Sequence, residues 1–244
     1  MKAMILAAGL GTRLRPLTDD RPKALVEVAG RTLLEITLTR LRGFGVREVI
    51  INVHHLADMI VEYLKRNENF GMRIEISREE TLLDTGGGLK KAAHFFQESD
   101  LETPFFVHNV DVISTIDLDR MLRFHKENQA LATLAVQDRE SSRYLLFDQE
   151  LRLCGRQSGP NRSQLVRPVA QVERLAFCGI HVISPRLFSL MEEEGAFSIT
   201  DAYLNLAAKG ADITAFRGDE YYWRDVGSLP SLKQAAEDLA QQAG

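Results

Sequence analysis

Apolar residues in the first half of the chain alternate between short runs and stretches with helical spacing. The short runs lie at residues 4–8, 48–53, 72–77, 105–108 and 131–136, and each has the length of a buried strand. Between them, leucine, isoleucine and methionine recur every three or four residues around 34–41, 56–64, 89–96 and 121–125, which predicts helices. Strands separated by helices pair in parallel. The pattern therefore predicts an α/β fold with a doubly wound, mostly parallel sheet of Rossmann-like type.

The pattern changes after about residue 144. Residues 144–182 predict strands and loops, with a turn at Gly159-Pro160-Asn161, and we interpret this stretch as a β-rich extension facing the substrate. Helices are then predicted at 185–194 and 200–209, a strand pair at 213–216 and 221–226, and a last helix from 228 to 244. No repeat or linker interrupts the 244 residues, which predicts a single domain.

Composition and charge exclude several classes of protein. Hydrophobic residues make up 45% and charged residues 26%, as in globular proteins, and the net charge of -4 provides no basic field for nucleic acid. No apolar run approaches the roughly 18 residues of a membrane span, and no signal peptide is evident. The two cysteines, Cys154 and Cys178, are far apart, which argues against a disulfide scaffold and fits the reducing cytoplasm.

Residues 6–23, LAAGLGTRLRPLTDDRPK, form the most informative segment. Small residues at the carboxyl end of a strand let a ligand approach the backbone, whose N–H groups can face phosphate. Arg13 and Lys23 add positive charge suited to phosphate oxygens. The segment is neither a dinucleotide-binding GxGxxG loop, because Leu14 replaces the third glycine, nor a Walker A loop, because no Gly-Lys-Ser/Thr follows.

This segment, with RPKALVEVAG continuing it, resembles the opening signature of the sugar-1-phosphate nucleotidylyltransferases. The resemblance implies that Arg13 lies near the leaving pyrophosphate and that Lys23 contacts the phosphates. It also implies a nucleotide-binding half at 1–140 and a sugar-phosphate-binding half at 141–227. The residues implied to hold the nucleotide here are Leu6, Ala7, Ala8, Gly9, Gly11 and Thr12, together with Arg13 and Lys23.

Two further motifs imply a Mg²⁺ site. Asn109 and Asp111 resemble the Asn-Gly-Asp strand end of the family, in which Asn109 would contact the nucleotide and Asp111 would bind the ion. WRDVG at 223–227 resembles the turn that carries the second ligand, here Asp225. The family glycine is replaced by Val110, which is strongly disfavoured if the position requires positive φ. Either the backbone is extended there or the metal geometry is altered.

The remaining candidates flank the nucleobase and the sugar. LDTGGG at 83–88 resembles a second glycine-rich loop that packs against the nucleobase through Thr85, Gly86 and Gly87, and three consecutive glycines predict close approach or positive φ. Gly179, in a Phe-x-Gly segment, is implied to lie near the sugar. Arg143 is a candidate for the sugar phosphate or for an ordinary surface arginine, and Asp201 for contacting the sugar or capping a helix.

The implied reaction joins a nucleoside triphosphate to a sugar 1-phosphate and releases pyrophosphate, with Mg²⁺ as cofactor. The Thr-Gly-Gly-Gly form and the short chain are most similar to uridylyltransferases that act on N-acetylmuramate 1-phosphate, and guanylyltransferases for mannose or heptose 1-phosphate are the alternative. A non-catalytic nucleotide-binding regulator is a second class. A glycosyltransferase would carry Asp-x-Asp where Asn109-Val110-Asp111 stands. Neither a nucleic-acid nor a membrane partner is expected, and the oligomeric state is left open.

Overall fold

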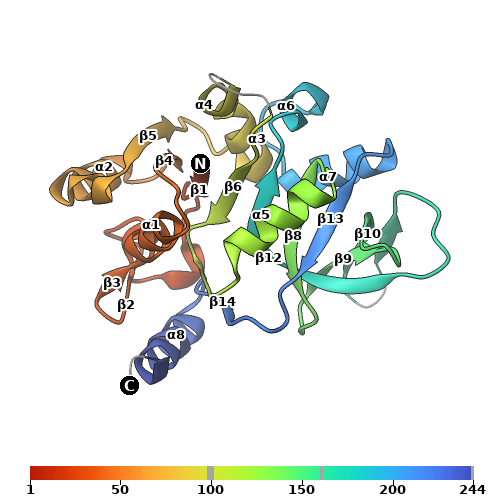
Figure 1. Cartoon of the computed structure of the whole chain (residues 1–244). Coiled ribbons are helices and arrows are strands. Elements are labelled where there is room, and N and C mark those ends of the chain that lie inside the picture. The colour runs from red at the N-terminus through yellow and green to blue at the C-terminus, as the bar shows by residue number, and fades with distance from the viewer. Residues whose placement is uncertain (98–101, 160–161, 243–244) are drawn as a thin grey trace.

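A central sheet of ten strands crosses the molecule, and the helices cover both of its faces (Figure 1). The computed structural model describes residues 1–97, 102–159 and 162–242. Along the sheet the order is β11-β10-β9-β12-β6-β1-β4-β5, and β8 and β13 continue from β12. These strands are β1 (Lys2–Leu6), β4 (Glu48–Val53), β5 (Arg73–Arg78), β6 (Phe105–Asn109), β8 (Ala132–Gln137), β9 (Arg143–Phe147), β10 (Leu153–Ser158), β11 (Ser163–Leu165), β12 (Glu173–Ile183) and β13 (Ile213–Arg217).

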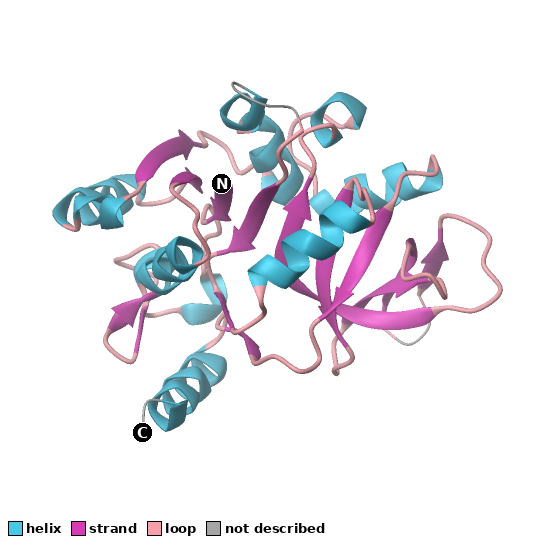
Figure 2. Ribbon diagram, viewed as in Figure 1, coloured by secondary structure: helices cyan, strands magenta, loops and turns pink. Residues whose placement is uncertain are grey.

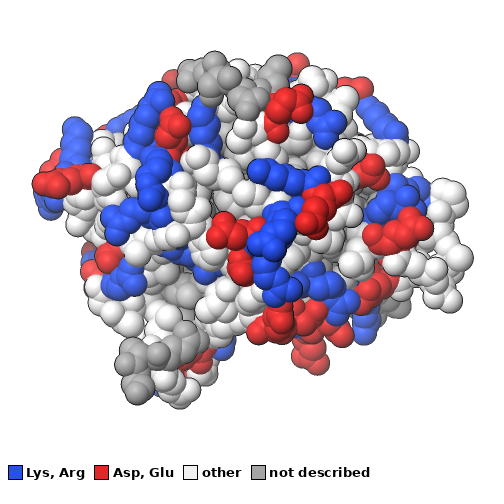
Figure 3. All heavy atoms as spheres, viewed as in Figure 1, with Lys and Arg blue, Asp and Glu red and all other residues white. Residues whose placement is uncertain are grey.

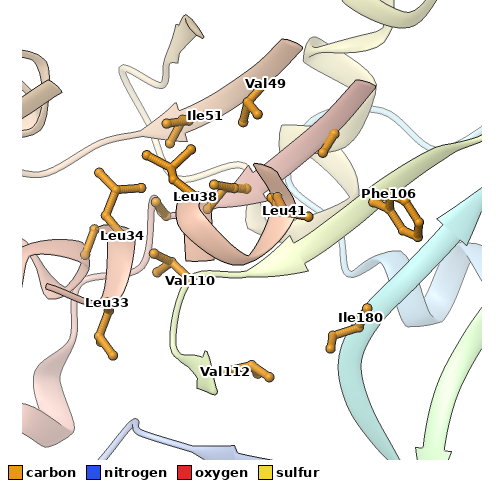
Figure 4. Packing of buried hydrophobic residues seen from close by; sticks show 14 of the residues in the cluster. Leu33, Leu34, Leu38, Leu41, Val49, Ile51, Phe106, Val110, Val112 and Ile180 are labelled. Atoms are coloured by element: carbon orange, nitrogen blue, oxygen red, sulfur yellow. The ribbon is translucent and has the colours of Figure 1, made fainter. Parts of the chain in front are cut away.

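The parallel part of the sheet alternates its apolar side chains between two cores. On β1, Ala3 and Ile5 pack into one buried cluster, while Met4 between them packs into the other. Successive side chains of a strand point to opposite faces, so a strand covered on both faces is apolar throughout. Figure 4 shows the first cluster where Leu38 and Leu41 of α1 lie against Val49 and Ile51 of β4.

Helices α1, α2 and α5 contribute to the first cluster, and α3, α4 and α7 to the second (Figure 2). Their bounds are α1 (Leu33–Gly43), α2 (Ala57–Arg66), α3 (Asp84–Lys91), α4 (Ala93–Gln97), α5 (Leu118–Glu127), α6 (Leu187–Leu190), α7 (Ile199–Ala208) and α8 (Leu229–Gln242). Thr32 caps the start of α1, because its hydroxyl accepts a hydrogen bond from the Glu35 N–H, and the helix ends at Gly43. The doubly wound α/β fold is confirmed.

The sheet is mixed rather than parallel throughout, because β12 is inserted between β6 and β8. Strands β5, β4, β1 and β6 are parallel, as are β8 and β13, but β12 runs antiparallel to both β6 and β8. Strands β9, β10 and β11 then extend the sheet in antiparallel order, which matches the expected β-rich extension. Helix α5 connects β6 to β8 in the manner of a crossover helix, but the two strands are not neighbours, because β12 lies between them.

Several expected boundaries are wrong. The predicted helix at 185–194 is only the short α6, and the glycine run at 86–88 lies inside α3 instead of preceding a helix. The strands predicted at 213–216 and 221–226 do not pair with each other: β13 joins β8, while β14 (Trp223–Asp225) pairs with β7 (Val112–Ser114). Strand β1 ends at Leu6, so 7–8 belong to the following loop. The predicted turn at 159–161 includes two positions outside the described residues.

The remaining elements are a small hairpin of β2 (Glu27–Val28) and β3 (Arg31–Thr32) and three 3-10 turns at Thr12–Leu14, Lys23–Leu25 and Glu68–Gly71. None of the described helices has the length and apolar character required to cross a membrane. On the face viewed in Figure 3, acidic and basic side chains are interspersed, so this face carries no large patch of one sign.

Candidate active site

The loop after β1 is folded tightly on itself. The Ala7 N–H donates to Asn52 Oδ1 over 2.8 Å, and Thr18 Oγ1 donates to the Gly11 carbonyl over 2.9 Å. Gly11 has φ of 67°, and a Cβ there would lie 2.9 Å from Thr18 Cγ2 and 3.2 Å from Lys23 Cβ. Glycine at position 11 therefore allows both the left-handed backbone and the close approach that brings Lys23 beside the loop.

A first cavity of about 460 Å³ opens at the carboxyl ends of β1, β4 and β6. Ligands of open α/β sheets bind at this edge, so its position agrees with the fold. The predicted residues Leu6, Ala7, Ala8, Gly9, Lys23, Thr85, Asn109 and Asp111 line it, together with Asn52, Glu79, Leu82, Asp84 and Val110. A Cβ at Gly9 would meet no atom within 4 Å, which leaves the backbone open to a ligand.

A buried polar pair that the sequence reasoning missed joins two walls of the first cavity. Asn52 Nδ2 donates to Glu79 Oε1 over 2.7 Å, and the Leu83 N–H donates to Glu79 Oε2 over 3.0 Å. Asn52 and Glu79 are 2% and 5% exposed. Since Asn52 also accepts from Ala7, the pair ties the loop after β1 to the segment before α3. The signal in the sequence was one asparagine inside the otherwise apolar run at 48–53.

A second cavity of about 1060 Å³ lies beside the first, and Asn109 lines both. Its lining residues include four further sequence candidates, namely Arg143, Gly179, Asp201 and Asp225. Arg13 also lines this cavity and not the first. Gly179 has φ of 70°, and a Cβ there would lie 2.7 Å from Asn109 Nδ2, so glycine allows β12 to approach Asn109. The sequence reasoning gave no site role to Arg139, Arg156 or Trp223, which also line the second cavity.

Pairing of β7 with β14 brings Asp111 and Asp225 together across 114 residues of sequence. Asp225 is in register with Val112, and the Val226 N–H donates to the Asp111 carbonyl over 2.8 Å. Asp111 lines the first cavity and Asp225 the second. The two carboxylates therefore stand where the cavities meet.

Each of these carboxylates faces a cation. Lys23 Nζ forms an ion pair with Asp111 Oδ2, and these side chains are 12% and 15% exposed. Arg13 Nη2 lies 4.0 Å from Asp225 Oδ1, and both side chains are more exposed, at 67% and 43%. The Gly227 N–H also donates to Asp225 Oδ1 over 2.6 Å, which fixes that carboxylate at the end of β14.

The carboxylates of Asp111 and Asp225 are ligands of the kind that a hard divalent cation prefers. Mg²⁺ is usually held by one or two carboxylates, with waters and substrate phosphates completing its oxygen ligands. Among the described residues no group of three or more His, Cys, Asp or Glu is arranged to hold a metal alone. A cation bound by Asp111 and Asp225 would therefore draw its other ligands from substrate and solvent.

The glycines of α3 are buried structural residues. Gly86 and Gly87 do not line either cavity, and both of their N–H groups donate to the Phe197 carbonyl, over 2.9 and 3.3 Å. They have negative φ, but the close approach expected for them is present: a Cβ at Gly86 would lie 2.3 Å from Phe197 Cε2. Thr85 beside them reaches the first cavity, and its hydroxyl accepts from the Ile199 N–H over 3.0 Å.

Gly11 and Thr12 have different surroundings from those expected, whereas Asp201 lines the second cavity. Thr12 and Gly11 do not line either cavity, because the turn at Thr12–Leu14 directs the loop toward Lys23. Asp201 does not cap α7, whose cap is Ser198; it forms an ion pair with Arg156 in the second cavity.

Val110 occupies the position of the family glycine without a positive φ. It is absent from the positive-φ residues, its N–H donates to the Leu6 carbonyl over 3.1 Å, and its side chain is 3% exposed. Figure 4 shows it among the apolar side chains near α1. Valine therefore causes no left-handed strain beside Asp111.

A sequence profile and sequence relatives indicate the same kind of protein, and solved structures share its fold. The sequence profile described as nucleotidyl transferase matches residues 2–242. The N-acetylmuramate alpha-1-phosphate uridylyltransferase of Caulobacter vibrioides is 35% identical, over 99% of this chain and 97% of its own length. A UDP-glucose pyrophosphorylase structure from Acinetobacter baumanii superposes with a TM-score of 0.78, at 20% identity, covering 99% of this chain and 98% of that one; this likeness concerns the fold.

A longer relative is nearly as similar. The mannose-1-phosphate guanyltransferase of Yarrowia lipolytica is 33% identical over 93% of this chain, and the match spans 61% of that enzyme. The two relatives use different nucleobases and sugars, so identity at this level does not choose between them.

Proposed function

The chain belongs to the nucleotidyl transferase family, and on that premise we propose that it transfers UMP from UTP to N-acetylmuramate 1-phosphate and releases pyrophosphate. The uridylyltransferase of Caulobacter vibrioides supports this choice, because its match extends over nearly the whole of both chains. We place the reaction in a reducing cytoplasm, in keeping with two cysteines that are both free thiols.

The observation that carries the proposal is the pair of cavities that share Asn109, with Asp111 lining the first and Asp225 the second. A reaction between two phosphorylated substrates needs two adjoining sites with charge compensation at their junction. The first cavity, at the sheet edge, suits the nucleotide, and the larger polar cavity suits the sugar 1-phosphate. Asp111 and Asp225, whose backbone segments are hydrogen-bonded through the Val226 N–H and the Asp111 carbonyl, offer two carboxylates that suit a Mg²⁺ ion shared by both substrates.

The chemistry requires positioning more than proton transfer. A phosphate oxygen of the sugar substrate is already anionic when it attacks the α-phosphorus in line, so no general base is required. Lys23, which lines the first cavity, would neutralise nucleotide phosphate oxygens, and Arg13 would offset charge that develops as pyrophosphate leaves. Mg²⁺ held by Asp111 and Asp225 would supply charge neutralisation of the phosphates.

A substrate panel tests the proposal. Four nucleoside triphosphates are combined with N-acetylmuramate, glucose, mannose and heptose 1-phosphates in the presence of Mg²⁺, and pyrophosphate release is measured. We expect the highest kcat/KM for UTP with N-acetylmuramate 1-phosphate. Turnover restricted to another pair would reject this specificity, and nucleotide binding without any pyrophosphate would indicate a regulator.

One observation favours guanylyl transfer as a second candidate. The Glu79 carboxylate lines the first cavity, where it can accept hydrogen bonds from a nucleobase edge. Guanine offers two adjacent donors, N1–H and the N2 amine, whereas uracil offers one donor between two carbonyl oxygens. The two carboxylate oxygens of Glu79 already accept hydrogen bonds from Asn52 and Leu83, which reduces the preference for guanine. In the same panel, GTP with mannose or heptose 1-phosphate would give the highest kcat/KM if this candidate is correct.

A further inference from the structure

The second cavity contains more positive charge than one sugar phosphate requires. Its lining includes five arginines, namely Arg13, Arg139, Arg143, Arg156 and Arg224, against three acidic residues, Glu140, Asp201 and Asp225. A sugar 1-phosphate brings a single phosphate, which would lie beside the carboxylates if the proposed function is correct, and Arg13 is assigned to the leaving pyrophosphate. The other arginines therefore need an explanation of their own.

Two of those arginines are neutralised within the protein. Arg156 forms an ion pair with Asp201, and Arg224 Nε lies 2.8 Å from Asp238 Oδ2. Among residues 1–97, 102–159 and 162–242, neither Arg139 nor Arg143 has a carboxylate within ion-pair distance. Glu140 lies between them in sequence, but only its backbone carbonyl contacts Arg139.

Arg139 is held rigidly in the cavity wall. Its guanidinium lies over the Trp223 ring, 3.7 Å from the ring centroid, and its Nη2 donates to the Phe177 carbonyl over 2.9 Å. The Trp223 ring is itself fixed, because its Nε1 donates to the Cys178 carbonyl over 2.7 Å. Arg139 Nε is buried without a hydrogen-bond partner. A partly desolvated cation without a counter-charge gains free energy when an anion binds nearby.

Arg143 differs in that only its backbone is fixed. It begins β9, its N–H donates to Ser141 Oγ over 3.2 Å, and Ser141 Oγ donates back to the Arg143 carbonyl over 2.8 Å. The Ser141 N–H donates to the Tyr144 hydroxyl over 2.9 Å, which holds the turn against the strand. The backbone of Arg143 is therefore fixed at the cavity wall, while its side chain is exposed.

We propose that Arg139 and Arg143 form a subsite for a second anionic group on the sugar, distinct from its 1-phosphate, and that this subsite makes the protein selective for acidic sugar 1-phosphates. The inference rests on the proposed function and specifies its substrate class. The planar guanidinium can bind a carboxylate through two parallel hydrogen bonds, and it can also bind a second phosphate. A carboxylate on a substituent of the sugar ring and a second phosphate ester are the two sources of such a group.

Matched pairs of substrates isolate the second anion. N-acetylmuramate 1-phosphate and N-acetylglucosamine 1-phosphate differ only in the lactyl ether with its carboxylate, and glucose 1,6-bisphosphate and glucose 1-phosphate differ only in the second phosphate. With UTP and with GTP in turn, we expect the parent to prefer the acidic member of one pair by about tenfold or more in kcat/KM, the size of a charged hydrogen bond. The pair that shows the preference identifies the anion.

Variants then test the residues. Arg143→Gln is expected to remove most of that preference, mainly through a higher KM for the acidic sugar, so that kcat/KM falls by a larger factor for the acidic sugar than for the neutral one. Arg143→Lys should retain part of the preference for the acidic sugar, because lysine keeps the positive charge but lacks the planar guanidinium that makes two parallel hydrogen bonds. Arg162→Gln is the matched control, since it removes an exposed arginine that does not line the cavity.

Arg139→Gln is also expected to weaken the preference, and near-ultraviolet circular dichroism of the variant would detect loss of the Trp223 environment. Turnover with equal kcat/KM for both members of both pairs would overturn the subsite and leave the transferase function intact. An equal loss for acidic and neutral sugars in Arg143→Gln would also overturn it. Absence of pyrophosphate with every sugar 1-phosphate would instead reject the proposed function.

Discussion

Individual charges at the junction of the two cavities have unequal surroundings. Lys23 and Asp111 are mostly enclosed and paired with each other, whereas Arg13 and Asp225 are more exposed and 4.0 Å apart. Enclosed charges depend on their partner for compensation, while exposed ones are screened by solvent. Arg13 and Lys23 should therefore respond differently to substitution, even though both are expected to contact phosphate oxygens.

Arg13→Ala is expected to lower kcat by roughly a hundredfold, the effect of losing one preorganised charge contact in the transition state. Lys23→Ala should raise KM for the nucleotide as well as lower kcat, because Lys23 lines the first cavity and would also bind ground-state phosphates. Steady-state pyrophosphate assays measure both constants. Unchanged kcat in Arg13→Ala would remove its role at the leaving group.

Asp111→Asn and Asp225→Asn are each expected to reduce the rate by well over about tenfold, because an amide is a weaker ligand for Mg²⁺ than a carboxylate. Chelation should abolish turnover by the parent, and added Mg²⁺ should restore it. Asp19→Asn serves as the control, since this exposed carboxylate lines neither cavity. Full activity in either site variant would contradict the metal assignment.

Val110→Gly should destabilise the protein by about 2 kcal/mol, because a buried side chain is lost and glycine makes the unfolded backbone freer. Activity should fall with it, since Val110 lies between Asn109 and Asp111. Urea unfolding followed by tryptophan fluorescence gives the stability. An increase of several-fold in activity would show that the valine strains the site after all.

Helix α3 forms although its glycines have low helix propensity, because its place in the fold requires residues without side chains. Three consecutive glycines disfavour a helix by about 1 kcal/mol each relative to alanine, yet they lie within α3. Their lack of side chains lets the helix approach Phe197 and the carbonyl of Gly195, to which a Cβ on Gly87 would come within 2.2 Å. The helix is thereby packed against the segment before α7, and its first residues, Asp84 and Thr85, reach the first cavity.

Gly86→Ala and Gly9→Ala distinguish a glycine that allows close packing of α3 from a glycine that leaves the loop after β1 open to a ligand. The added methyl group at position 86 clashes with Phe197 and should lower stability by about 1–3 kcal/mol despite better helix propensity. At position 9 it meets no atom within 4 Å, so stability should change by less than about 0.5 kcal/mol, while the KM for the nucleotide rises. Thermal unfolding and nucleotide titration distinguish the two. Reversed results would place the nucleotide at α3.

At the scale of the whole molecule, buried histidines link folding to pH. Burial lowers the pKa of His108 and of His125 to about 4, and burial lowers that of His181 to about 3. In the unfolded chain each imidazole titrates near pH 6.5. Below that pH the unfolded state binds more protons than the folded state, so the stability that these groups contribute is present above about pH 6.5 and lost on acidification toward pH 4.

The free energy of unfolding should therefore decrease below pH 6.5, by up to about 1.4 kcal/mol per pH unit for each histidine. Urea denaturation at a series of pH values between 7 and 5 measures this slope. His125→Gln should make the slope shallower by up to one proton, since glutamine can still bond to Thr133. His55→Gln, at an exposed position, should leave it unchanged; a shallower slope in this control instead would contradict the assignment.

The sequence by itself determined the local parts of this protein. The runs at 48–53 and 105–108 predict buried strands, and the spacing of Leu34, Leu38 and Leu41 predicts α1, because these signals depend on near neighbours in the chain. The segment from Leu6 to Lys23 likewise predicts a phosphate-binding loop from neighbouring residues alone, because small residues follow a strand there and basic residues come close behind.

Only the tertiary structure decided which distant segments meet. The insertion of β12 between β6 and β8, the pairing of β14 with β7, and the burial of Gly86 against Phe197 depend on contacts between residues far apart in sequence, which leave no periodic signal. The same contacts place Asp225 beside Asp111 and gather Arg139 with Arg143 around the second cavity. The sequence named Lys23, Asp111 and Asp225, but the roles of Glu79 and Arg139 and the grouping into two adjoining cavities are properties of the folded chain.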